Sequence, residues 1–247
     1  MKRILWAGAF ALAIGGQALA ADLPPPSPAP RAPATYVPVA APIYNWSGIY
    51  IGVNGGYGFG SSNWSSPAAP GFPASTTGNF NTNGWLGGGT VGANYQFWGG
   101  AVLGVEGDWD WTNLNGTSVA APCVAVAPAT GCQTSSDWLG TVRGRAGWAF
   151  DRVLLYGTGG VAFAPVQMTI TNSGGGTNSN TEVGWTAGAG LEFAFAPNWT
   201  AKAEYLYVDL NNGSCTSACG SPPAPAVSGK FTENVIRAGV NFKFNPW

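Results

Sequence analysis

Histidine is absent from all 247 residues of the sequence. Its absence excludes a Ser–His–Asp triad and other acyl-transfer centres that depend on an imidazole base. The four cysteines are not spaced as CxxC pairs, so without histidine the sequence does not favour a zinc site. The glycine-rich runs lack the Lys-Ser/Thr ending of a phosphate-binding loop. We therefore expect no enzyme activity, no catalytic residues, no cofactor and no bound metal.

Charge is also scarce. Charged residues make up 9% of the sequence and the net charge is −1, whereas a typical soluble domain is about 25% charged. No basic patch points to a nucleic-acid partner. A soluble protein this poor in charge would have little to keep it dispersed, but lipid would cover the outer surface of a membrane barrel. No apolar run reaches the roughly 18 residues that a membrane-spanning helix needs.

The N-terminus has the three parts of a secretory signal peptide. Lys2 and Arg3 are followed by an apolar stretch over 4–14 and by the small residues around Ala20. We predict a signal peptide over 1–20, cleaved between Ala20 and Ala21; a retained N-terminal anchor is the alternative. Residues 21–45 contain eight prolines, which favour extended chain and cannot join a β-ladder. They are predicted to form a periplasmic linker, and 46–247 the folded domain.

From Trp46 onward, apolar residues alternate with polar or small ones, with the period of two that is typical of membrane β-strands. The strands predicted from this pattern cover 47–59, 84–97, 100–112, 136–150, 152–164, 181–195, 198–210 and 231–244. The gaps between them alternate between short and long. The pattern predicts an all-β fold: an eight-stranded antiparallel up-and-down transmembrane β-barrel, with short periplasmic turns and four long extracellular loops.

The charges fall on the strand face opposite the large aromatic residues. If the apolar face meets lipid, a luminal charge cluster follows: Glu106, Asp108, Asp110, Arg143, Arg145, Glu192, Lys202, Glu204 and Arg237. The same alternation places Asp137 on this inner face. Paired carboxylates can do acid/base chemistry, but an eight-stranded barrel is barely wide enough for its own side chains. We therefore interpret the cluster as ion pairs that plug the lumen.

Aromatic residues and cysteines occupy distinct places in this pattern. Tryptophans near the strand ends, such as Trp98 and Trp148, fit the aromatic girdles of a membrane barrel; the competing interpretation is a sugar-stacking platform in a soluble β-protein. The cysteines lie in predicted loops as two close pairs, Cys123 with Cys132 and Cys215 with Cys219. In an oxidising compartment each pair can form a disulfide; free thiols and cross-pairing are the alternatives.

Four segments, 45–52, 104–108, 141–145 and 235–244, resemble the small outer-membrane surface proteins of alphaproteobacteria. This is the opacity-type, OmpA-like β-barrel group, some members of which are called porins. The resemblance implies an outer-membrane location, envelope integrity, surface antigenicity and contact with a host or the environment. It also implies a terminal aromatic strand as the signal for barrel insertion. Here that end contains Phe242, Phe244 and Trp247, and the three residues after Phe244 leave the recognised end open.

The predicted partners are outer-membrane lipid and lipopolysaccharide, the barrel-assembly machinery, and an extracellular or host ligand at the loops. The main functional hypothesis is a structural and surface-interaction protein of the outer membrane. One alternative is a small-solute diffusion porin. Another is a secreted soluble β-sandwich that binds carbohydrate.

Overall fold

The computed structural model describes residues 44–68, 70, 73–120, 131–171, 177–215 and 227–244. The signal peptide, most of the linker, Cys123, Cys219 and Trp247 lie outside these residues. Among the described residues, no helix is long and apolar enough to cross a membrane.

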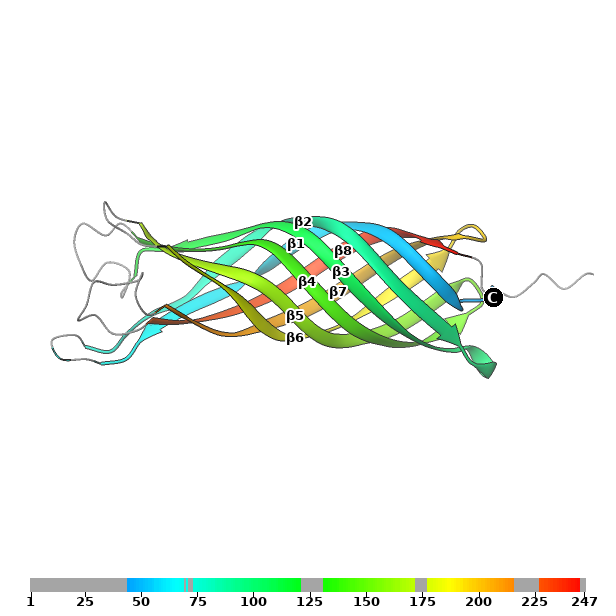
Figure 1. Cartoon of the computed structure of the whole chain (residues 1–247), viewed down its shortest axis with the longest axis horizontal. Helices are drawn as coiled ribbons and strands as arrows, with labels where there is room; N and C mark the ends of the chain where they lie inside the picture. The colour runs from blue at the N-terminus through cyan, green and yellow to red at the C-terminus, as the bar shows by residue number, and fades with distance from the viewer. Residues whose placement is uncertain are drawn as a thin grey trace, which may run out of the picture. The chain divides into compact units, whose positions relative to one another are not determined.

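Eight antiparallel strands follow one another around a closed barrel, because β1 pairs with β8 as well as with β2 (Figure 1). This confirms the predicted fold, and it shows that the soluble β-sandwich alternative is wrong. The strands are β1 (Gly48–Ser66), β2 (Ser75–Gln96), β3 (Ala101–Ser118), β4 (Gly131–Phe150), β5 (Val153–Thr171), β6 (Thr177–Ala194), β7 (Trp199–Cys215) and β8 (Val227–Lys243).

The two ends of the barrel differ in their connections. At the proximal end, β2 and β3 are joined by the short 3-10 turn η1 (Trp98–Gly100), and β4 and β5 by a turn in which Asp151 has φ 53°. The longer connections lie at the opposite, distal end. All eight strands extend further toward this end than the sequence predicted; β1, for example, continues to Ser66 rather than to 59.

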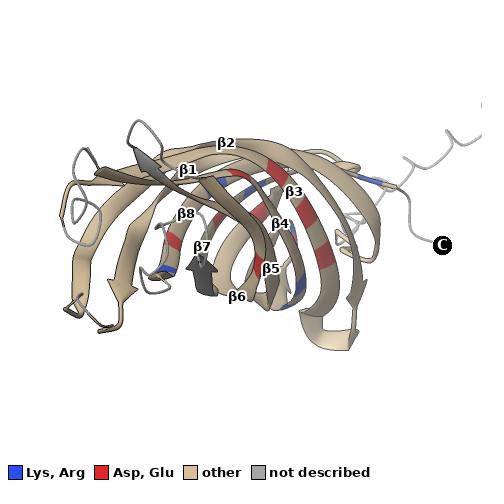
Figure 2. Cartoon of the chain, turned by 60° about the vertical axis from the view of Figure 1, so that its left-hand side comes forward, with Lys and Arg blue, Asp and Glu red and all other residues tan. Residues whose placement is uncertain are grey.

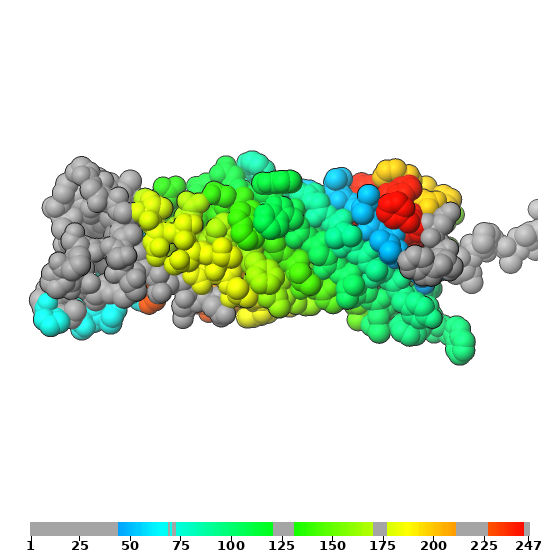
Figure 3. Space-filling view, viewed as in Figure 1, coloured from blue at the N-terminus to red at the C-terminus, as the bar shows by residue number. Residues whose placement is uncertain are grey.

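A belt of large apolar and aromatic side chains surrounds the proximal part of the outer surface. Along β2 it begins at Trp85 and ends at Phe97, the residue after the strand, and both side chains are exposed. Twelve residue steps of ~3.4 Å at a strand tilt of ~40° give a height of ~30 Å. That height matches the hydrocarbon core of a bilayer. On the face seen in Figure 3, side chains cover the outer surface of the barrel.

Beyond the belt the alternation continues but its polarity reverses. Many outward side chains on the distal strands are amides and hydroxyls, such as Asn63, Asn81 and Asn115, while Trp64 and Leu114 are buried in the lumen. Apolar-in, polar-out alternation is the pattern of a soluble barrel. The predicted strands ended too early because they were traced by apolar residues on the outward face, and in the distal part the apolar residues face the lumen.

A β-bulge in β4 corrects one predicted position. The register between β4 and β5 shifts between Ser135 and Gly140. A bulge adds a residue to one strand and so changes which side chains face inward. Asp137 is consequently exposed on the outer surface, next to the outward Trp138, instead of on the luminal face as predicted.

Apolar clusters close the described lumen near both ends. The floor cluster, at the proximal end, comprises Trp46, Val102, Ala149, Leu154, Tyr156 and Ala194. The distal plug comprises Trp64, Phe80, Leu114, Cys132, Leu139, Ala162, Ala164, Val166, Met168, Val208, Leu210, Val227 and Phe231. Charged side chains fill the space between them, and Figure 2 shows acidic and basic positions gathered on the middle of the strands.

Candidate functional site: the charged layer of the lumen

The charged layer consists of the nine residues predicted for the luminal cluster, and each of them is buried. They come from β3, β4, β6, β7 and β8. Alternation along each strand turns these side chains inward, and the antiparallel register brings them to the same level: Glu106 lies opposite Arg143, and Glu204 opposite Arg237. Ion pairs can therefore cross the lumen as well as run along its wall.

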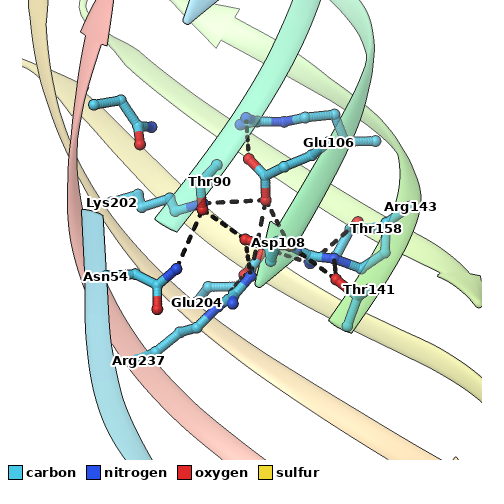
Figure 4. A network of polar contacts seen from close by, with 12 residues as sticks. Asn54, Thr90, Glu106, Asp108, Thr141, Arg143, Thr158, Lys202, Glu204 and Arg237 are labelled. Carbon is cyan, nitrogen blue, oxygen red and sulfur yellow. Dashed lines mark hydrogen bonds and ion pairs between the residues drawn. The ribbon is translucent and has the colours of Figure 1, made fainter. Parts of the chain in front are cut away.

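Arg143 lies at the centre of the network (Figure 4). Its Nη2 contacts Glu106 Oε1 at 2.5 Å and Asp108 Oδ2 at 2.6 Å, and its Nη1 contacts Glu204 Oε1 at 2.9 Å. Nε also donates to Thr141 Oγ1 at 3.1 Å. The side chain has no solvent exposure. A guanidinium with several donors in one plane is suited to bind several carboxylates at once.

Arg237, on β8, also contacts several carboxylates through its guanidinium group. Its Nη1 is 2.9 Å from Asp110 Oδ2, and its Nη2 is 3.0 Å from Asp108 Oδ1 and 2.6 Å from Glu204 Oε2. Lys202 Nζ lies 3.1 Å from Glu106 Oε1 and also donates to Thr90 Oγ1 at 3.4 Å. Asp108 and Glu204 each contact both Arg143 and Arg237, which links the opposite walls of the barrel.

Arg145 extends the layer toward the floor cluster. Its Nη2 lies 2.7 Å from Glu192 Oε2, its Nη1 lies 3.3 Å from Glu106 Oε2, and its guanidinium carbon lies 3.9 Å from the centre of the Tyr156 ring. The second oxygen of Glu192 accepts from Thr200 at 2.5 Å and from Asn241 at 2.9 Å. The structure thus brings all nine predicted residues into one continuous set of ion pairs.

Sequence reasoning did not single out the neutral partners of this layer. Tyr50 donates to Glu106 Oε2 at 2.7 Å, Thr90 to Asp108 Oδ1 at 2.6 Å, and Tyr156 to Glu204 Oε1 at 3.2 Å. With them, all eight strands contribute a side chain. The period-two alternation of the strands places these three residues on the luminal face, so their inward orientation could be predicted from the sequence. Sequence reasoning lacked only the cross-strand register.

The segment before β1 closes the proximal mouth. Trp46 is 1% exposed; its Nε1 donates to the Asp151 carbonyl at 2.9 Å, and its backbone N–H donates to Gln96 Oε1 at 2.8 Å. The Lys243 ammonium lies 4.1 Å from the centre of the Tyr44 ring and donates to the Asn45 carbonyl. Burial raises the pKa of Tyr44 to about 12, so this hydroxyl stays protonated at neutral pH. The sequence-based linker therefore ends in an ordered contact with the barrel.

Glu233 is an exception among the luminal carboxylates. It is 1% exposed, accepts one hydrogen bond of 3.1 Å from Thr82, and has no partner for Oε1 among the described residues. Leu114 and the backbone of Gly60 lie beside it. No Lys or Arg of the described residues forms an ion pair with it, and the sequence-based cluster did not include it.

The remaining predicted residues lie away from this layer. Cys132 is disulfide-bonded and buried in the distal plug. Phe242 and Phe244 lie at the proximal end of β8, where their rings are 5.3 Å apart, and the Phe244 N–H donates to the Ile49 carbonyl. Among the described residues, no group of three or more Cys, Asp or Glu side chains is placed to hold a metal ion.

Comparisons with known proteins agree with this architecture. Residues 32–244 match the family described as outer membrane protein beta-barrel domain. The chain is 33% identical to the 31 kDa outer-membrane immunogenic protein of Brucella melitensis, over 99% of this chain and 100% of the relative.

Two solved structures share the fold. The outer membrane protein OprG from Pseudomonas aeruginosa matches with a TM-score of 0.51 and 12% identity, over 81% of this chain and 99% of that one. The outer membrane protease OmpT from Escherichia coli matches with a TM-score of 0.50 and 7% identity, over 83% and 99%. At these identities the likeness extends to the fold alone. The match over most of the sequence shows that the chain belongs to the outer membrane protein beta-barrel domain family and is a protein of the outer membrane.

Proposed function

We propose that this protein is a closed structural barrel that contributes to the integrity of the outer membrane and contacts its surroundings through its distal surface. The observation that carries the proposal is the filled lumen. Buried ion pairs cross it from wall to wall, with the floor cluster below them and the distal plug above.

The energetics favour a lumen that stays closed. A solute could pass only if the Arg143 and Arg237 pairs separated, and removing one partner of a buried ion pair costs about 3–5 kcal/mol. Several such pairs would have to open together, because Asp108 and Glu204 are each held by both arginines. The belt on the outside and the network on the inside therefore support a rigid wall rather than a passage.

The name of the Brucella melitensis relative, an outer-membrane immunogenic protein, supports a role at the cell surface. We extend that role to this chain as exposure of the distal end to the exterior, opposite the short turns. We also propose that the aromatic end of β8, with Phe242 and Phe244, is what the barrel-assembly machinery recognises. No enzymatic step is part of the proposal, since the carboxylates of the charged layer are occupied by cations and hydroxyl groups.

Planar-bilayer conductance of the purified, refolded protein tests the closed lumen. We expect no discrete openings from the wild-type protein, whose folding is verified by heat-modifiable gel mobility. A porin inserted in the same bilayers provides the positive control. Discrete openings of constant size that grow in the Arg143→Ala variant would contradict the closed barrel and support the diffusion porin.

A deletion strain tests the contribution to the envelope. We expect increased sensitivity to detergent and increased release of outer-membrane vesicles, both restored by the wild-type gene. Unchanged sensitivity and unchanged vesicle release would contradict this part of the proposal while leaving the closed lumen intact.

A further inference from the structure

An asparagine patch lies on the distal outer surface of β1, β2 and β3. Its members point outward just beyond the belt: Asn63, Asn79, Asn81, Asn83, Asn113 and Asn115. All are exposed except Asn63, which is half-buried. The strands hold them side by side, since Asn63 is opposite Asn79 and Asn83 is opposite Asn115.

Much of the hydrogen-bonding capacity of the patch is unused within the described part of the chain. Asn63 Nδ2 donates to Asn79 Oδ1 at 3.0 Å, and Asn115 Nδ2 donates to the Asn113 carbonyl at 3.2 Å. The side-chain amides of Asn81 and Asn83 make no hydrogen bond to another described residue. Each amide offers two donors and one acceptor oxygen to a ligand.

The patch carries no formal charge. Segments 60–66, 75–84 and 112–118, which form the distal parts of these three strands, contain no Asp, Glu, Lys or Arg. Lys230 of the neighbouring strand β8 lies opposite Asn63, and its ammonium forms an ion pair of 3.5 Å with Asp209, so the cation at this edge of the patch is already paired. A phosphate or sulfate ligand would require Arg or Lys, so the patch suits a neutral polar partner.

Two tryptophans border the patch on the side of the belt. Trp85 is 56% exposed and Trp111 is 62% exposed, and each lies two residues from an asparagine on the same face of its strand. Amides beside an exposed aromatic face can bind a sugar, because its hydroxyls hydrogen-bond to the amides while its C–H face packs on the ring. The tryptophans also mark where the lipid-facing surface ends.

We propose that the asparagine patch binds the neutral sugars of the lipopolysaccharide core in the surrounding leaflet. The patch continues the lipid-facing surface directly, and the core is joined through the lipid A disaccharide to the acyl chains that cover the belt. The core sugars therefore stand above the belt, at the height of the distal part of the patch. The inference depends on the outer-membrane location and is independent of whether the lumen is closed.

The test measures binding of lipid-free core oligosaccharide, released from lipopolysaccharide by mild acid, to refolded full-length protein in micelles by isothermal titration calorimetry. The test variant replaces four patch residues: Asn81→Ala, Asn83→Ala, Asn113→Ala and Asn115→Ala. The matched control replaces four outward polar residues of β5 and β6, across the barrel: Gln167→Ala, Thr169→Ala, Ser179→Ala and Thr181→Ala. We expect at least tenfold weaker binding in the test variant and a change of less than twofold in the control.

Further arms identify the chemistry of the ligand. Enzymatic removal of phosphate from the oligosaccharide should leave its affinity unchanged, and lost affinity would overturn the neutral-sugar proposal. Equal binding of a dextran of the same length would show a nonselective surface and would overturn the assignment to the core. If the fourfold variant does not show heat-modifiable mobility, the single variants Asn81→Ala and Asn115→Ala are measured, with a threefold loss expected. None of these binding results changes the conductance expected for the closed lumen, so the two proposals can fail independently.

Discussion

Two halves of one barrel solve opposite solvation problems with the same alternation. In the membrane half, Val105 and Trp85 point outward while Glu106 and Arg143 point into the lumen. In the distal half, amides point outward while the distal plug fills the lumen. The strands run continuously through both halves; three strand pairs shift register near the boundary, and the side chains on each face change in polarity. Each half therefore buries the side chains that its surroundings cannot solvate: charged side chains in the membrane half and apolar side chains in the distal half.

Removal of Arg143 should have the largest effect, because the membrane half depends on paired charges. Arg143→Ala leaves Glu106, Asp108 and Glu204 without one of their cations. We expect the free energy of unfolding to fall by about 3–5 kcal/mol, measured by urea titration in lipid vesicles. Gln167→Ala, on the distal outer surface, is the control and should change stability by less than ~0.5 kcal/mol. Equal effects would remove the distinction between the halves.

An arginine substituted on the outer surface should impair insertion of the barrel when it lies in the membrane half but not when it lies in the distal half. Val105→Arg places a charge on the belt, where it costs about 2–4 kcal/mol near the middle of the bilayer. Asn115→Arg places the same charge on the distal wall, where position 115 is exposed beyond the belt. We expect impaired insertion of the first variant and normal insertion of the second, measured as the heat-modifiable fraction after refolding. Impaired insertion of both would place the distal strands inside the membrane.

A cavity in the distal plug should loosen that half only. Met168 is 3% exposed within the plug, and its replacement by alanine should cost about 2 kcal/mol. Hydrogen exchange should become faster in the distal parts of β5 and β8 and stay slow around the charged layer. Thr169→Ala, one position along and outward, controls for the substitution itself. Uniformly faster exchange would mean that the two halves unfold as one unit.

The sequence predicted the membrane half better than the distal half, and the reason is physical. The period of two places all nine charged residues on the luminal face, because an outward charge there would meet lipid. Beyond the belt the same period continues with Trp64 and Leu114 inward, so a search for outward apolar residues ends the strands too early. The bulge that exposes Asp137 depends on pairing with β5, and local sequence does not carry that information.

Glu233 lies between the charged layer and the distal plug, and it gives the smallest and most diagnostic prediction. Alternation places it inward with Arg237, but its isolation follows from the register, which sets Gly60 and Val208 opposite it. Its carboxylate accepts a hydrogen bond from Thr82 and forms no ion pair with a described residue, so burying its charge costs free energy that nothing in its surroundings recovers.

Glu233→Gln keeps the volume of the side chain and an acceptor for Thr82 while it removes the need to bury a charge. We expect this substitution to stabilise the barrel by about 1 kcal/mol. The same change at Glu204 has the opposite sign, because it leaves Arg143 and Arg237 without their shared carboxylate, and should cost about 3 kcal/mol. Urea unfolding at neutral pH measures both. If Glu233→Gln also destabilises, a cation or ordered water compensates this carboxylate, and the charged layer extends past Glu233 toward the distal start of β8.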